Sequence, residues 1–408
     1  MIIDIGSPFV VIAGVLLALG WARCRKGNDL VVLLFSIVCI LDMNMISAPL
    51  AVVNGQEISC SDVALVLFFI FAFALAVKNR ALISRRMLVS ALAISTILLL
   101  SLLVNFFHPY EGSIVASGVS WDLFVQGMVL QSDQEIGGRN LFVFLRYVLF
   151  VFSGVLTVSL FGGNDFIRVG RYILIAGKIH IGYAVFELGM KVLFESSIAS
   201  QFTSFLFADS HIYTSYFQRE SLVALWGITR EPSHFVLALG WFVIVFTLLK
   251  MTGNASRDKI AWPIMAIVLM CLSAASSIVV LLPALVFFIL AINQIRRDGR
   301  VHLLSAAVGI LILFAGFYFV AEAGIVQALP YFGKATGVLE SLGDAFRGNY
   351  FALRTVEGSP RLISVVESIR VWMDVPLCGI GVGSMNPFSG VFAQLVNTGI
   401  LGFCSWLV

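Results

Sequence analysis

The chain has 408 residues, of which 60% are hydrophobic and only 12% are charged, and its formal net charge is +3. Soluble domains carry about twice that charged fraction, so this composition excludes an ordinary soluble protein. The six cysteines stand singly, without the spacing of a metal site, and a disulfide between Cys60 and Cys378 is not expected. The chain has no HExxH motif and no P-loop. No metal or cofactor is therefore expected, and nucleic acid is not an expected partner.

Apolar runs that are long enough, or nearly long enough, to cross a bilayer recur along the whole chain. They predict an all-α, polytopic integral membrane protein, with one transmembrane domain over 1–408 and about eleven transmembrane helices. A serine- and alanine-rich break at 273–277 divides two short spans. The expected spans are 7–22, 30–50, 62–77, 87–107, 141–161, 171–190, 233–251, 260–275, 277–293, 301–320 and 390–408.

Basic residues give these spans an orientation. Alternate short connections hold lysines and arginines, as in Arg23–Lys26, Lys78–Arg86, Arg168–Arg171 and Arg296–Arg300, which places those connections on the cytoplasmic side. The other connections then face outward, and the longest of them contain apolar patterns that predict amphipathic helices at the membrane surface. In a bacterium this is the periplasmic face of the inner membrane. The external connections are 51–61, 108–140, 191–232 and 321–389.

The first candidate site is the segment GITREPSHF at 227–235. Pro232 begins the next span, which puts Arg230 and Glu231 at the outer mouth of a helix and His234 in its first turn. A helix N-terminus beside an arginine favours an anionic group such as a phosphate. Glu231 could act as a general base or could orient an arginine. The alternative is an ion pair at the membrane boundary with no role in chemistry.

Arginines are also unusually frequent in the outward-facing connections. Positive charge is normally depleted on that side of the membrane, and lysine is scarce there. Arginine binds phosphate oxygens through paired hydrogen bonds and keeps its charge when desolvated, so the bias favours a phosphate ligand over exposed, solvated charges. The external arginines are Arg219, Arg230, Arg347, Arg354, Arg361 and Arg370.

The stretch 359–385 is the second candidate site. Ser359 and Pro360 suit a helix start, and apolar residues then recur at helical spacing until Asp374 and Pro376 end the helix. Arg361 and Arg370 fall on opposite flanks of this amphipathic helix, about 13 Å apart along its axis, so one phosphate would not engage both. The glycine loop that follows can turn sharply or approach a ligand closely, through Gly379, Gly381 and Gly383.

These residues together resemble a known family. Arg361, the pattern DxPxxGxGxGS from Asp374 to Ser384 and the segment NTGILGF at 397–403 resemble the signature of the O-antigen polymerase and ligase superfamily. REPSHF resembles a motif of the exopolysaccharide polymerases in that group. The chain departs from the ligase branch, because 387–390 holds no histidine before the TGILG segment, and Ser277 stands where the family has an arginine. The resemblance therefore favours the polymerase branch.

The resemblance implies a type-C glycosyltransferase-like membrane fold that joins oligosaccharide repeat units carried on undecaprenyl diphosphate. Arg361 and Arg230 would stabilise the departing diphosphate, and Glu231 or His234 would take the proton of the acceptor hydroxyl. Further contacts to diphosphate or glycan would come from Arg219, Arg354 and Arg370, with Gly381 and Gly383 in the loop. Expected partners are the lipid-linked oligosaccharides, membrane lipids, a chain-length regulator and a flippase.

Two other functions are open. A ligase of the same fold would transfer a finished glycan to another acceptor. A transporter or flippase of lipid-linked sugars would place charged residues at mid-membrane depth and show internal symmetry. This chain instead concentrates its charges in the outer connections, with Lys178 the main exception.

Overall fold

The protein was examined as a computed structural model. Its described residues fall into two compact units: unit 1 covers Met1–Asn79 and Leu160–Ala323, and unit 2 covers Arg80–Ser159 and Gly324–Val408. The residues that the structure describes are 27–43, 49–53, 56–112, 114–115, 134, 136–194, 198–199, 201–202, 218–219, 222–223, 225, 227–228, 232–254, 259–273, 278–298, 359–387 and 390–407.

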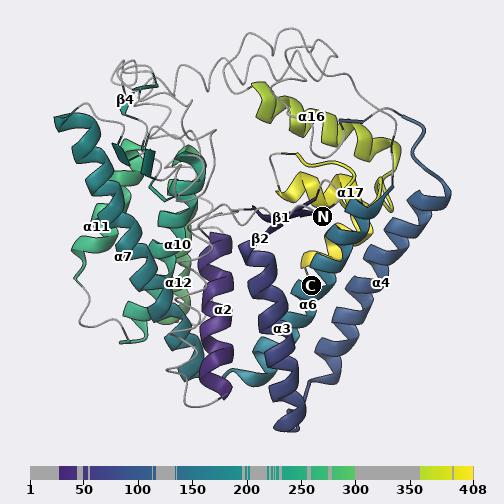
Figure 1. Ribbon diagram of the computed structural model, residues 1–408, viewed down its shortest axis with the longest axis horizontal. Coiled ribbons are helices and arrows are strands. Elements are labelled where there is room, and N and C mark those ends of the chain that lie inside the picture. Colours follow the sequence, from purple (N-terminus) through teal and green to yellow (C-terminus); the bar gives the residue numbers. More distant parts are fainter. Residues whose placement is uncertain are drawn as a thin grey trace. The chain divides into compact units, whose positions relative to one another are not determined.

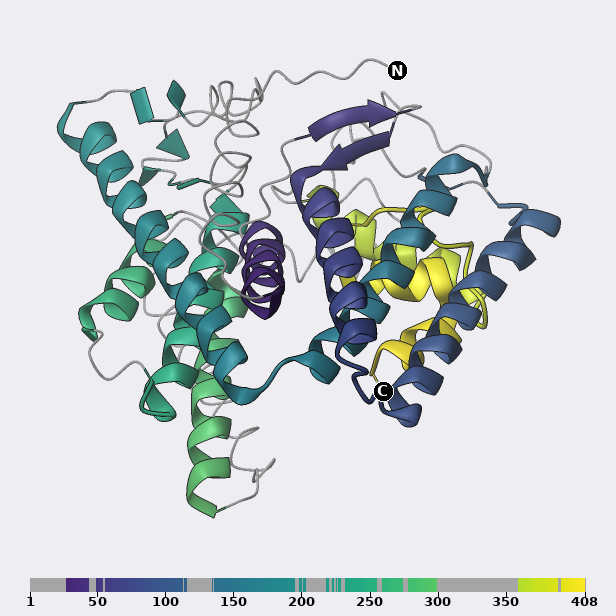
Figure 2. The same ribbon diagram turned by 60° about the horizontal axis from the view of Figure 1, so that its bottom comes forward.

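In its described residues, unit 1 consists of helices and two short hairpins (Figure 1). The antiparallel hairpin β1–β2 leads directly into helix α3, as Figure 2 shows, and β3–β4 is a pair of two-residue strands. The elements are α2 (Gly27–Met43), β1 (Pro49–Val53), β2 (Gln56–Ser59), α3 (Cys60–Lys78), α7 (Gly163–Leu193), β3 (Gln218–Arg219), β4 (Leu222–Val223), α10 (Pro232–Met251), α11 (Ala261–Leu272) and α12 (Ile278–Asp298).

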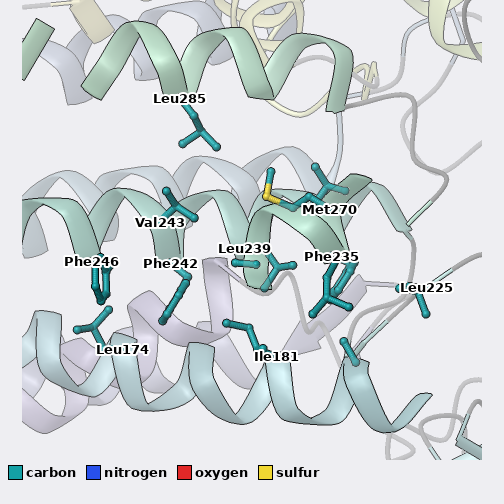
Figure 3. Close-up of a cluster of buried hydrophobic side chains, with 14 of the residues drawn as sticks. Leu174, Ile181, Leu225, Phe235, Leu239, Phe242, Val243, Phe246, Met270 and Leu285 are labelled. Carbon is teal, nitrogen blue, oxygen red and sulfur yellow. The ribbon is translucent and has the colours of Figure 1, made fainter. Parts of the chain in front are cut away.

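The core of unit 1 forms around α10, which packs against α7, α11 and α12. In Figure 3 phenylalanines of α10 point toward Leu174 and Ile181 of α7. At Gly177 of α7 an added Cβ would lie 2.2 Å from the ring of Phe242, so the glycine permits the close approach of the two helices. The buried residues of α10 in this core are Phe235, Val236, Leu239, Phe242, Val243, Phe246 and Leu249.

Local sequence explains where two of these helices begin. Ser59 caps α3 in a capping box, because its hydroxyl accepts from the Asp62 N–H at 3.2 Å and Asp62 accepts from the Ser59 N–H at 2.9 Å. At α7 the Gly162 N–H donates to Asp165 at 3.1 Å. Arg168, in the second turn of α7, forms an ion pair with Asp29 of α2 at 2.7 Å, which links the two helices.

Unit 2 contains α4 (Arg85–Phe107), α6 (Gly138–Leu160), α16 (Ser359–Asp374) and α17 (Gly390–Leu407). Helix α17 packs against both α4 and α16. A small core gathers beneath α16 from segments far apart in the sequence. Its buried members are Ile114, Val115, Ile363, Val366, Val371, Ile380, Met385 and Val396.

The apolar helices confirm a membrane protein in its coarse outline. Within the described ranges, five helices are long and apolar enough to cross a bilayer, namely α3, α4, α6, α7 and α10. The expected spans 62–77, 87–107, 141–161 and 233–251 match described helices closely. The spans 7–22 and 301–320 lie outside the described residues, and the total of about eleven stays a prediction.

Four of the expected spans differ from the described helices. The run 30–50 ends as a helix at Met43, because its last residues enter strand β1. Helix α7 begins at Gly163, so Arg168 and Arg171 lie inside a helix and not in a connection. Helix α11 has 12 residues, too few to cross a bilayer alone. Helix α17 is kinked at Gly399 and is not one continuous span.

Candidate functional site

The glycine loop, residues 375–385, is exposed at its start and largely buried within unit 2 from Gly379 onward. Ile380, Val382 and Met385 have at most 1% of their surface exposed, so the loop inserts its apolar side chains into the core beneath α16. Gly379, Gly381 and Gly383 have φ values of +65°, +93° and +79°, which alternate with these buried residues. In the sequence GIGVGSM, the glycines therefore allow the backbone to turn, and the apolar residues between them pack into the core of unit 2.

The loop carbonyls are satisfied by neutral side chains from two helices and one connecting residue. Asn105 of α4 donates to the Gly379 carbonyl at 2.9 Å, and Asn140 of α6 donates to the Val382 carbonyl at 2.8 Å. Gln134 donates to the Ile380 carbonyl. Because unpaired backbone groups are costly in a low-dielectric interior, these bonds allow an irregular loop to be buried. With Ser101 and Asn397, these three side chains form what we call the amide network.

The loop also fills the break in α17. At Gly399 the backbone has φ +65° and ψ −170°, so the helix is interrupted there. The Ile400 and Leu401 N–H groups donate to the carbonyls of Pro376 and Leu377, at 2.8 and 3.3 Å. An added Cβ at Gly399 would lie 2.2 Å from the Leu377 oxygen, so backbone meets backbone at this point. The loop thus supplies the acceptors that the interrupted helix lacks.

Asn397 and Ser101 complete the network from α17 and α4. The Asn397 amide both donates to the Met385 carbonyl at 2.8 Å and accepts from its N–H at 2.9 Å. The Ser101 hydroxyl lies 2.8 Å from the Cys378 carbonyl and 3.0 Å from that of Asn397. The DxPxxGxGxGS pattern and the NTGILGF segment therefore make one packed unit, although the chain separates them.

Helix α16 turns an unexpected face toward the protein. The inward face mixes apolar and polar side chains, whereas Met373, in the apolar stripe of the sequence, is 64% exposed. The buried residues of α16 are Ile363, Ser364, Val366, Glu367, Ser368 and Val371. Val365, Ile369 and Trp372 of that stripe are only half-buried. An interfacial helix needs an apolar face that remains open to lipid, so this orientation suits a helix at a membrane surface.

Arg370 lies near the C-terminal end of α16 and pairs with Glu367. Its Nε and one terminal nitrogen donate to Glu367 Oε2 at 3.0 and 2.9 Å. The carboxylate neutralises the guanidinium, and the C-terminal end of a helix is itself partially negative. Asp374 adds a further acidic group in the last turn. The surroundings of Arg370 therefore oppose the binding of an anion.

Tyr110 joins this edge of the site from the segment after α4. Its hydroxyl donates to Asp374 Oδ2 at 2.5 Å, and its N–H donates to Gln134 of the amide network. Partial burial raises the pKa of the Tyr110 phenol, and the bond to Asp374 raises it further, while the charge of Arg370 acts in the opposite direction. Asp374 thus contributes to the fold as well as ending α16.

Arg361 occupies the opposite end of the same helix. It is the third residue of α16, which runs from Ser359 to Asp374. The first turn of a helix presents unsatisfied N–H groups and the positive end of the dipole, and both favour an anionic ligand. The position expected for Arg361 in the sequence is thus confirmed, and its role toward a diphosphate stays a prediction.

Gly381 and Gly383 have protein neighbours where a ligand was expected. An added Cβ would lie 3.0 Å from Ile136 Cδ1 at Gly381 and 3.1 Å from the Val143 side chain at Gly383. These contacts and the positive φ values account for glycine at both positions. Substrate binding by the two residues stays a prediction.

The second motif, 227–235, is held by α7. The Gly227 N–H donates to Glu187 Oε2 at 2.7 Å, and the Ile228 N–H donates to His180 Nε2 at 3.3 Å. Glu187 also bonds Lys191 at 2.6 Å. Gly227 has φ +57°, and a Cβ there would lie 2.3 Å from His180 Nε2, so only glycine fits this turn.

The remaining expected site residues have few described surroundings. His234 lies in the first turn of α10 and is half-buried, as the sequence predicted. Arg219 lies in strand β3. Arg230, Glu231 and Arg354 lie outside the described residues. Their roles stay predictions.

The residues that hold both motifs were missed at the sequence level. Asn105 and Asn140 lie at the ends of apolar helices, and Glu187 lies in an apolar run four residues before Lys191. A polar residue in an apolar span is the signal that could have found them, because such a residue needs a partner inside the protein. The partner itself could not be read, since Asn105 bonds a residue 274 positions away.

Comparison with known proteins gives no match: no protein-family model, curated protein or solved structure matches this chain. The chemistry open to the protein follows from the two motifs. Unit 2 carries Arg361 in the first turn of α16, and the buried glycine loop follows that helix in the sequence. Unit 1 presents a fixed turn that leads, through three residues, into α10. In the described part of the chain, no group of three His, Cys, Asp or Glu side chains could hold a metal ion.

Proposed function

We propose that this protein is a polysaccharide polymerase of the O-antigen polymerase and ligase superfamily. It would join oligosaccharide repeat units carried on undecaprenyl diphosphate, at the periplasmic face of the bacterial inner membrane. The observation that carries the proposal is the contact between the two halves of the sequence signature. The helix that begins beside Arg361 runs into the glycine loop, and that loop packs into the break of the TGILG segment.

The reaction needs charge stabilisation more than covalent chemistry. The hydroxyl oxygen of the acceptor sugar forms a bond to the anomeric carbon of the donor chain, and the bond from that carbon to the diphosphate oxygen breaks. The hydroxyl proton passes to a base, for which Glu231 is the candidate and His234 the alternative. Undecaprenyl diphosphate leaves with the electron pair, and preorganised arginines stabilise its charge.

The two arginines of α16 would have unequal roles. Arg361 lies in the first turn, where the helix dipole and the free N–H groups favour a phosphate. Arg370 is paired with Glu367 near the other end, where the dipole is negative. We therefore assign the diphosphate to Arg361 on α16. Arg230, Arg219 and Arg354 keep the contacts to diphosphate or glycan that the resemblance implies, and Arg370 is left with a contact to uncharged glycan only.

Deletion of the protein tests the proposal and separates it from its alternatives. Cells without a polymerase should carry glycans of a single repeat unit, with long chains lost. Free lipid-linked polymer would instead identify a ligase. Lipid-linked units that accumulate on the cytoplasmic side would identify a flippase. Gel profiles of the surface glycan, with extraction of the lipid-linked pool, distinguish these three results.

Substitution within α16 tests the assignment of the arginines. Arg361→Ala should reduce long-chain glycan at least about a hundredfold, the usual effect of losing one group that stabilises transition-state charge. Arg370→Ala is the matched control on the same helix and should keep most of the activity. Equal losses in both variants, with normal amounts of protein in the membrane, would contradict the electrostatic distinction.

A further inference from the structure

Helix α7 carries three buried ionisable residues that the proposed reaction does not use. His180, Glu187 and Lys191 recur at intervals of seven and four, which places them on one face of the helix. Their exposed fractions are 2%, 1% and 7%. Ionisable side chains within an apolar helix are costly to bury, so the residues of this polar face of α7 require an explanation.

The polar face of α7 accepts hydrogen bonds from two consecutive backbone N–H groups. Glu187 directs one carboxylate oxygen to Lys191 and the other to the Gly227 N–H, and His180 Nε2 accepts from Ile228. If the Glu187–Lys191 ion pair served only α7, Glu187 Oε2 would have no need to accept from the Gly227 N–H. A bond from an N–H to a charged carboxylate is about twice as strong as a neutral one.

The chain on either side of this turn is also fixed. Leu225 is fully buried in the core of unit 1. Phe235, in the first turns of α10, is fully buried and its ring lies 5.2 Å from that of His180. Three residues, 229–231, connect Ile228 to Pro232, and four residue steps reach at most about 14 Å. The segment that contains Arg230 and Glu231 is therefore short and connects two described residues.

We propose that His180 and Glu187 are positioning residues that hold the Gly227–Ile228 turn and, through it, the Arg230–Glu231 pair. The inference rests on the proposed function, because it assigns a task to residues behind the motif that the reaction uses. Lys191 lies 2.6 Å from the Glu187 carboxylate and is its ion-pair partner in this apolar setting. His180 is neutral in this arrangement, with its proton on Nδ1, because Nε2 accepts the Ile228 hydrogen bond.

A pair of double variants isolates the bond to Gly227. Glu187→Gln with Lys191→Met removes both charges and keeps an oxygen acceptor. Glu187→Leu with Lys191→Met removes the charges and the acceptor together. Hydrogen–deuterium exchange of the purified full-length protein in detergent, followed in peptides that contain 227–228, reports directly on the two N–H groups.

We expect these amides to exchange at least about tenfold faster in the Leu/Met variant than in the Gln/Met variant, as the loss of one buried hydrogen bond predicts. Equal exchange in the two variants would overturn the proposal. If the Leu/Met variant does not fold, His180→Phe and His180→Gln replace the pair, because Phe keeps the ring against Phe235 without an acceptor and Gln supplies one. The same tenfold difference is expected at Ile228.

Glycan length in cells completes the test. The Leu/Met variant should lose long chains while the Gln/Met variant keeps them. Faster exchange with unchanged chain length would overturn the positioning role and leave the polymerase assignment intact. That assignment depends on the deletion phenotype, which is measured without any of these variants, so the two failures are distinguishable.

Discussion

Each unit of this protein fixes a glycine turn against a helix, and the two solutions differ in chemistry. In unit 2 the amide network donates neutral hydrogen bonds to the carbonyls of the glycine loop. In unit 1 a carboxylate and an imidazole accept from the N–H groups of the Gly227–Ile228 turn. A network of neutral bonds distributes its stabilisation over many groups, whereas a buried ion pair concentrates it in two side chains.

The largest effect is expected where backbone meets backbone in unit 2. Gly399→Ala should destabilise the protein by about 5 kcal/mol, because the strained backbone conformation and the overpacked contact with Leu377 each cost about 1–3 kcal/mol and the backbone cannot move aside. Thermal unfolding in detergent measures the loss. Gly154→Ala in α6, where no atom lies within 4 Å of the added Cβ, is the control and should be neutral. Similar melting curves for the two would refute the interlocked arrangement.

In unit 1, loss of Lys191 alone should destabilise the protein strongly, and a second substitution at Glu187 should restore most of that stability. Lys191→Met leaves the buried Glu187 charge without its partner and should cost about 3–4 kcal/mol. Adding Glu187→Gln removes that charge and should restore most of the loss. Unfolding of the single and double variants measures the coupling. Additive losses would show that the two side chains act independently.

A single bond of the amide network should cost less. Asn105→Leu leaves the Gly379 carbonyl without its donor and should destabilise unit 2 by about 2 kcal/mol. Ser95→Ala on the same helix removes a local bond to the Ala91 carbonyl and should change stability little. If Asn105→Leu destabilised the protein as much as Lys191→Met, one neutral hydrogen bond would contribute as much stability as the buried ion pair.

The smallest effect on stability is expected from Tyr110, whose phenol bonds Asp374 next to the glycine loop. The pKa of Tyr110 is raised in the folded protein by burial and by Asp374. The unfolded state therefore loses this proton first, so the stabilisation is present below about pH 10 and is lost as the pH rises further. Stability curves from pH 8 to 12 should fall less steeply in Tyr110→Phe than in the parent protein. Parallel curves would remove Tyr110 from the alkaline transition.

Hydropathy and turn signals were sufficient for the local structure. The run from Arg85 to Phe107 is apolar and bounded by basic and polar residues, and it forms α4 as expected. Ser359, Pro360 and Asp374 likewise mark the two ends of α16. The prediction of a connection at Arg168 and Arg171 was wrong, because both residues lie inside α7. Their basic side chains suggested a loop, but Arg168 donates to Asp29 of α2 from within the helix.

Tertiary contacts of the site could not be read in the same way. The pattern of α16 showed an apolar stripe, but the face toward the protein combines only part of it, Val366, with the polar Ser364 and Glu367. Which face packs inward depends on the partner, and here the partner is the glycine loop, which offers the apolar side chains of Ile380 and Met385. Periodicity reveals that a helix has two faces, and it cannot reveal which one meets lipid.

The break at Gly399 has a consequence for how the chain is assembled. Ile400 and Leu401 donate their N–H groups to Pro376 and Leu377, and hydrocarbon offers no substitute acceptor. If α17 left the insertion machinery alone, those groups would face lipid unpaired. We therefore expect the loop and α17 to enter the bilayer together, already folded against each other as one hairpin.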